Sequence, residues 1–226
     1  MTIWERISEA IAALRAGESL SVVFEKLRTP PERSVAFTIA VVALGAKMAK
    51  ADGLVTRNEV AAFREVFYIP KEEEENTARL FNLARQDVAG FEDYARRVAG
   101  MFDSADGTLC DLMEGLFYIA VADGAYHPQE DDFLSRVAQI FGLPEREFKA
   151  LRARFVPDAE PDPYDVLGVE PGADLDSIRQ AWRALVRESH PDRMMARGVP
   201  EEAVKLAEKR LIAINRAWET ISEGRA

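Results

Sequence analysis

The sequence predicts an all-α protein, and three observations support this fold class. Apolar residues recur at helical spacing along most of the chain, for example at Phe133, Val137 and Ile140. No stretch shows the alternation of apolar and polar residues that is typical of a half-buried strand. A segment of the first half is repeated further along, and its repeat unit is predicted to be two helices and their joint.

Composition indicates a folded protein with one large domain or two small ones. The chain has 226 residues, of which 48% are hydrophobic, enough to bury substantial cores. A net charge of -10 disfavours nucleic acid and anionic membranes as partners. The single cysteine, Cys110, excludes an internal disulfide and is predicted to be a buried small side chain in a reducing compartment.

We expect a cytoplasmic protein without a membrane span. The first predicted helix carries Glu5 and Glu9 among its apolar positions, unlike the uninterrupted apolar core of a signal peptide. The longest apolar run, residues 35–46, is shorter than the roughly 20 residues that a membrane-spanning helix needs.

Residues 1–154 are predicted to form a helical domain that contains the internal repeat. The two copies are "AKMAKADGLVTRNEVAAF", residues 46–63, and "FYIAVADGAYHPQEDDFL", residues 117–134. Each contains Ala-Asp-Gly and a glutamate seven residues after the aspartate. Gly53 or Gly124 is expected to end the first helix of each copy in a left-handed conformation.

A capping box is expected to open the second helix of each copy. The expected pairs are Thr56 with Glu59, and His127 with Glu130. Pro128 suits the first helical position after His127. His127 is therefore interpreted as a helix cap without a chemical role, although it precedes a proline as His190 does.

A cation site is the alternative interpretation of the two joints. If the copies pack as a pseudo-symmetric pair, four acids could supply oxygen ligands to calcium or magnesium: Asp52, Glu59, Asp123 and Glu130. Each joint lacks the dense Asp-x-Asp spacing of a calcium loop, and both glutamates already have a capping role. We therefore favour structural joints, with no metal and no cofactor.

A linker is predicted at residues 155–162, between the first domain and a second domain at residues 163–226. The stretch "FVPDAEPDPY", residues 155–164, holds three prolines among acidic residues and interrupts the helical pattern. After it, "YDVLGV" predicts a short helical turn that Gly168 closes.

The second domain is predicted to be an antiparallel helical hairpin. Residues 174–189 form an amphipathic helix with Ile178, Trp182 and Leu185 on its apolar face. Residues 201–222 form a second helix, and its stripe is expected to pack on that face: Leu211, Ile214, Trp218 and Ile221.

The first hairpin helix also carries a basic row and ends at a proline. Arg179, Arg183 and Arg187 recur every four residues on its other side. Pro191 disfavours helical geometry at His190, so "HPDRMMARGVP" is expected to be an exposed loop at the tip of the hairpin.

Residues 163–222 resemble a J domain, the DnaJ-type module. The resemblance rests on "YDVLGV", "IRQAWRALVRESHPDR", the His-Pro-Asp tripeptide and "INRAWETI". It implies that His190, Pro191 and Asp192 engage a DnaK-type ATPase chaperone and stimulate its ATP hydrolysis. It also implies that the basic helix docks on an acidic surface of that partner through Arg179, Arg183 and Arg187, and that Arg193, just after the tripeptide, contacts the chaperone as well.

The N-terminal part resembles a TerB-like helical domain, so the order of the two parts resembles the DjlA-type J-domain cochaperones. Trp182 and Trp218 stand where the J-domain family commonly has tyrosine, and the basic helix contains Glu188 and no lysine. The membrane anchor of the better-known DjlA proteins is not expected here.

Two other functions were considered. An enzyme would need a nucleophile with a base, a metal cluster or a phosphate-binding loop, and the two histidines lie in separate domains. We therefore expect no enzyme activity. The favoured function is a cochaperone that binds clients through its N-terminal domain. The alternative is an acidic, metal-responsive or stress-response module whose J domain only recruits the chaperone.

Overall fold

The computed structural model describes residues 9–10, 12–13, 16, 18, 22–23, 33–51, 71, 74–86, 90–102, 107–122, 124–156, 161–200 and 204–224. Regular structure in these ranges is helical, which confirms the all-α prediction. The helices are α3 (Arg33–Ala51), α5 (Glu74–Gln86), α6 (Phe91–Ala99), α7 (Thr108–Ala120), α8 (Pro128–Phe141), α9 (Glu145–Phe155), α10 (Pro163–Leu167), α11 (Leu175–Glu188), α12 (Pro191–Ala196) and α13 (Val204–Gly224).

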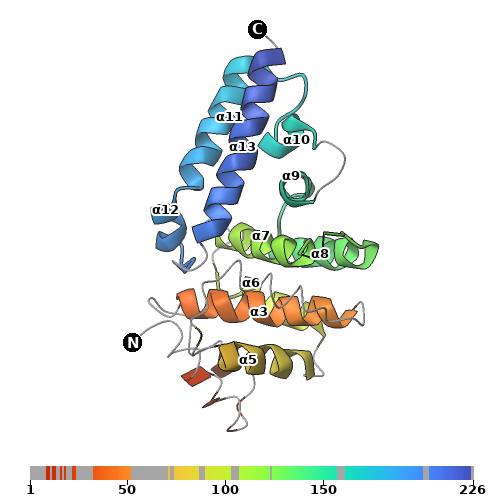
Figure 1. Ribbon diagram of the computed structural model, residues 1–226, viewed down its shortest axis with the longest axis vertical. Coiled ribbons are helices and arrows are strands. Elements are labelled where there is room, and N and C mark those ends of the chain that lie inside the picture. The colour runs from red at the N-terminus through yellow and green to blue at the C-terminus, as the bar shows by residue number, and fades with distance from the viewer. Residues whose placement is uncertain are drawn as a thin grey trace.

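The N-terminal helices pack in layers around α3 (Figure 1). Helix α3 contacts α5, α6 and α7, and α6 contacts α8. The side chains of residues 35–48 are all buried, so the long apolar run of the sequence is a helix enclosed by other helices. No helix in the described ranges combines the length and the apolar character that crossing a membrane requires.

The C-terminal helices form the predicted hairpin, which stands on the N-terminal layers (Figure 1). Helices α11 and α13 run antiparallel, and α10 contacts both α13 and α9. The hairpin core contains Ile178, Ile214 and Ile221, all at most 2% exposed, with Trp182 and Trp218 packed against it. The predicted contacts between the two helices are therefore confirmed for these residues.

The second copy of the repeat has the predicted joint. Helix α7 ends at Ala120, and Gly124 has the expected left-handed conformation with φ 87°. His127 is the N-cap of α8, Pro128 is the first helical residue, and the Glu130 carboxylate accepts a 2.7 Å hydrogen bond from the His127 N–H. The joint of the first copy, with Gly53, Thr56 and Glu59, lies outside the described residues.

The segment that follows Asp192 is not the exposed loop that the sequence predicts. Residues 191–196 form α12, while Met194 and Val199 are each only 1% exposed. These two side chains belong to the same hydrophobic core as α3 and α7, and so does Leu206 at the start of α13. The prediction failed because burial of this segment depends on docking against α7, which no local pattern indicates.

The two parts of the chain that the predicted linker separates are in direct contact. Helix α9 ends at Phe155 and α10 begins at Pro163, while residues 157–160 lie outside the described ranges. Helices α9 and α10 pack together, and the Arg154 Nε donates a 3.0 Å hydrogen bond to the backbone oxygen of Val166. The hairpin is held against the N-terminal helices by side chains as well as by the chain connection.

Candidate functional site

At the tip of the hairpin the chain turns from α11 into α12 through His190, Pro191 and Asp192, the three residues called the tip loop below. Helix α11 ends at Glu188, and His190 is extended with φ -67° and ψ 132°, as expected for a residue before proline. His190 is also the N-cap of α12, because its Nδ1 accepts a 3.2 Å hydrogen bond from the Asp192 N–H. Pro191 occupies the first helical position, where no N–H is needed.

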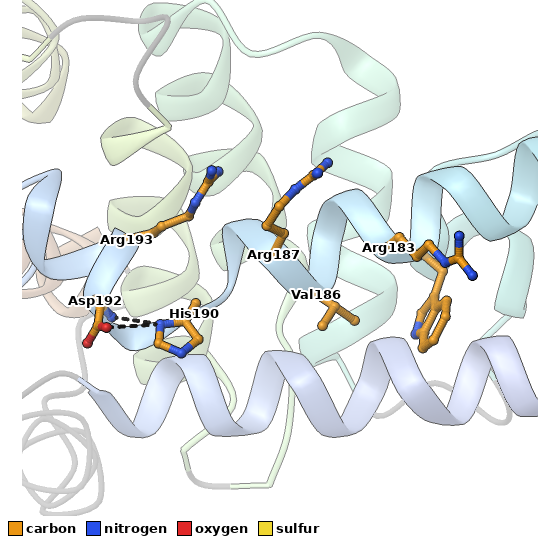
Figure 2. Close-up of a pocket in the computed structure, with 7 residues that line it drawn as sticks. Arg183, Val186, Arg187, His190, Asp192 and Arg193 are labelled. Atoms are coloured by element: carbon orange, nitrogen blue, oxygen red, sulfur yellow. Dashed lines mark hydrogen bonds and ion pairs between the residues drawn. The ribbon is translucent and has the colours of Figure 1, made fainter.

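The two polar side chains of the tip loop are exposed. The His190 side chain is 61% exposed and that of Asp192 80%, with Nδ1 and Oδ2 separated by 3.7 Å. Figure 2 shows both contacts between them. Because Nδ1 accepts a hydrogen bond, the proton of the neutral imidazole lies on Nε2, which remains a donor for a bound partner.

The arginines of the basic row on α11 differ in whether they form an ion pair with another described residue. Arg179 forms a 3.1 Å ion pair with Asp176, and its guanidinium lies 5.8 Å from the centre of the Trp218 ring. Arg183 and Arg187 are exposed, and neither forms an ion pair with another residue that the structure describes. Within the described ranges, these two arginines can therefore meet an acidic partner without first losing an ion pair.

Arg193, the fourth arginine expected at the site, pairs with Glu188. Both side chains are 50% exposed. The ion pair reduces the positive charge near the tip loop.

An open groove of about 490 Å³ runs beside the tip loop (Figure 2). Its lining residues are Trp182, Arg183, Val186, Arg187, His190, Asp192 and Arg193. It thus brings together the tip loop, three of the four expected arginines and two apolar side chains, while Arg179 lies outside it. We call it the tip groove.

Sequence reasoning missed the apolar part of this groove. Trp182 was expected only in the hairpin core, and Val186 was not singled out. The signal was present in the sequence, since Val186 follows Trp182 by one helical turn and stands between Arg183 and Arg187. The tip groove therefore offers both charged and apolar contacts to a partner.

The four acids considered for a cation site are only partly described. Asp52, Glu59 and Asp123 lie outside the described residues. Glu130 is 4% exposed and serves as a helix cap, as stated above. Within the part of the chain that the structure describes, no group of three or more His, Cys, Asp or Glu side chains is arranged to hold a metal ion.

Comparison with known protein families matches both parts of the chain. Residues 38–153 match the family described as Tellurite resistance protein TerB, and residues 162–225 match the DnaJ domain. The TerB match covers just over half of the 226 residues. No solved structure matches the chain.

Several proteins similar to this chain are named Co-chaperone protein DjlA. The one from Vibrio parahaemolyticus is 28% identical over 236 residues, covering 88% of this chain and 82% of that protein. The one from Coxiella burnetii is 29% identical, covering 79% and 74% respectively. The one from Escherichia coli is 30% identical over 128 residues, covering 46% and 47%. The chain therefore belongs to the TerB family and, with a DnaJ domain after its TerB region, is a DjlA-like J-domain cochaperone.

Proposed function

We propose that this cochaperone binds a DnaK-type ATPase chaperone through the tip loop and the tip groove, and that it stimulates ATP hydrolysis by that partner. The observation that carries the proposal is the exposure of His190 and Asp192 beside two unengaged arginines and an apolar groove floor. Neither side chain is needed in a hydrophobic core, so their place at the surface suits recognition.

Electrostatics support the same surface as the docking face. The chain as a whole has a net charge of -10, so a general attraction to an acidic partner is excluded. Arg183 and Arg187 create a local positive surface next to the tip loop, and exposed charges of this kind steer the encounter and fix its orientation. Trp182 and Val186 add apolar contact area that is lost to water when a partner covers the groove.

The N-terminal domain is proposed to contact the client or another partner. In the described part of this domain, Val22 is the only large hydrophobic residue that is strongly exposed, at 44%. A client contact made by the described surface would therefore be mainly polar.

The test of the proposed function compares the two histidines of the chain. ATP hydrolysis by a purified DnaK-type chaperone is measured alone, with the full chain, and with the His190→Gln or His127→Gln variant. His127 is the matched control, because it is also exposed, also precedes proline and also caps a helix. The proposal expects stimulation by the wild type and by His127→Gln, and none by His190→Gln; equal stimulation by both variants would contradict it.

A further inference from the structure

Arg197 lies just after α12, on the side of the tip loop that faces the N-terminal helices. Its side chain is only 11% exposed and crosses the start of α7. Gly107, the N-cap of α7, has φ 81°, and a Cβ at this position would lie 3.5 Å from Arg197 Nε. That distance is an ordinary van der Waals contact, so the left-handed backbone, and not a lack of space, favours glycine at this position.

Arg197 is bound to α7 at both its side chain and its backbone. Its Nε and Nη2 donate hydrogen bonds of 3.0 and 2.9 Å to Oδ2 of Asp111, and Nη2 lies 3.3 Å from Oδ1. The Thr108 hydroxyl donates a 3.0 Å hydrogen bond to the Arg197 backbone oxygen. Several charge-assisted bonds to a buried carboxylate restrict the position of an arginine strongly.

The same guanidinium also reaches the end of α11. Nη2 donates a 3.2 Å hydrogen bond to the Glu188 backbone oxygen, and Nη1 lies 3.3 Å from the Glu188 carboxylate. Glu188 is the last residue of α11 and stands two residues before His190. One side chain thus connects the N-terminal domain to the backbone from which the tip loop emerges.

The contact belongs to a larger buried cluster of charges. Asp111 and Glu114 of α7 are each 1% exposed and face arginines from three other segments. Arg210 of α13 pairs with both carboxylates, and Arg154 of α9 lies 3.7 Å from Glu114. Because a buried charge that loses its partner is strongly unfavourable, moving the hairpin away from α7 would cost free energy at each of these pairs.

We propose that Arg197 is a positioning residue for the tip loop, through which Asp111 of the N-terminal domain sets the orientation of His190 and Asp192 toward the chaperone. The inference rests on the proposed function, because it concerns the efficiency of the same stimulation. It assigns a role to the N-terminal domain that requires no client. The TerB region provides the surface on which the tip loop is held.

Arg197 is expected to affect stimulation more than binding. Helix α11 lines the tip groove with Trp182, Arg183, Val186 and Arg187, and among the described residues no hydrogen bond or ion pair joins Arg197 to these four side chains. The orientation of the tip loop depends on the end of α11, which Arg197 does contact. Loss of this connection should therefore lower the maximal stimulated rate, while the concentration that gives half of that rate changes little.

The experiment compares two buried arginines of one cluster. In Arg197→Lys the positive charge remains beside Asp111, but a single ammonium cannot replace the fork of bonds to Asp111 and Glu188. Arg210→Lys removes a similar fork of bonds, to Asp111 and Glu114, yet Arg210 has no hydrogen bond or ion pair to Glu188 among the described residues. Arg210→Lys therefore controls for loss of stability without loss of the link to the tip loop.

Two quantities are measured on the full-length variants at a temperature where both are folded. The first is the maximal stimulation of a purified DnaK-type chaperone, which Arg197→Lys should lower by roughly 2- to 30-fold. The second is hydrogen exchange of the Arg193 and Met194 amides, which both bond to the His190 backbone oxygen. Their exchange should be faster in Arg197→Lys and unchanged in Arg210→Lys.

Wild-type stimulation and exchange by Arg197→Lys would overturn the inference. Equal losses in the two variants would also overturn it, because they would reveal a contribution to stability alone. Failure of the proposed function is distinguishable, since the wild type itself would then fail to stimulate. Exchange at Arg193 and Met194 would in that case still decide whether Arg197 positions the loop.

Discussion

Trp182 of α11 and Trp218 of α13 stack with their ring centroids 5.1 Å apart and their planes inclined by 14°. The Trp182 Nε1–H also donates a 2.9 Å hydrogen bond to Oδ1 of Asn215. The pair therefore joins the two hairpin helices at the tip groove, which Trp182 itself lines. Both positions depart from the tyrosine that is common in J domains, and the larger rings provide more contact between the helices.

Trp218→Ala should lower the free energy of unfolding by about 2–3 kcal/mol, less than a fully buried ring because Trp218 is half-buried. Urea denaturation followed by circular dichroism measures the change. Ile212→Ala is the matched control on the same helix, since Ile212 is 68% exposed and should change stability by less than about 0.5 kcal/mol. Equal effects of the two substitutions would show that the stacked pair contributes little.

Reversing Arg183 and Arg187 to glutamate should weaken chaperone binding and flatten its dependence on salt. Two exposed ion pairs of roughly 0.5 kcal/mol each amount to about 1 kcal/mol, or about fivefold in Kd, and repulsion adds to this loss. Arg179→Glu should have a smaller effect, because Arg179 is already paired with Asp176. Binding titrations at low and high salt measure Kd for both variants. Equal losses of affinity at all three positions, or no loss at any of them, would contradict the role of Arg183 and Arg187 in docking.

Glu130→Ala should destabilise the chain by about 1 kcal/mol, the usual cost of losing a helix cap, because the His127 N–H loses its acceptor. Asp132→Ala, an exposed acid on the same helix, is the control for loss of charge. Thermal unfolding in calcium and in magnesium extends the measurement. A rise in Tm with either ion that Glu130→Ala abolishes would assign Glu130 to a cation site instead of a cap.

Cys110 should react slowly with alkylating reagents. Burial raises the pKa of its thiol, and the Glu147 carboxylate, 2.7 Å away, raises it further. A raised thiol pKa means less reactive thiolate at any pH below it, so alkylation at pH 8 should be at least about tenfold slower than in the urea-unfolded chain. Mass spectrometry of iodoacetamide-treated protein measures both rates, and equal rates would contradict this environment for Cys110.

Local signals in the sequence were sufficient for the ends of helices. Pro191 ended α11 before His190, Gly168 closed α10 with φ 64°, and Pro128 opened α8, all as predicted. The extended conformation of His190 in the tip loop was predicted in the same way, because a residue before proline disfavours helical geometry. The pairing of Arg179 with Asp176 could also have been predicted, because the two residues are three positions apart on one helix.

Long-range partners could not be predicted in this way. Asp111 and Arg197 are 86 positions apart, and nothing in either neighbourhood indicates the other. Pro191 ends α11, so the residues after it were predicted to be an exposed loop, whereas docking on α7 buries Met194 and Val199. Helical periodicity indicates that a face is buried but not which helix covers it.

The most direct test of the central claim, that the tip loop recognises the chaperone and does not maintain the fold, is made on Asp192→Asn. Thermal unfolding and stimulation of a purified DnaK-type chaperone are measured on the same preparation. The Asp192 side chain is 80% exposed, so Asp192→Asn should change the free energy of unfolding by less than about 0.5 kcal/mol and leave Tm close to that of the wild type. Stimulation of the chaperone should be lost. A variant that unfolds at a much lower temperature, or that stimulates as the wild type does, would contradict the claim.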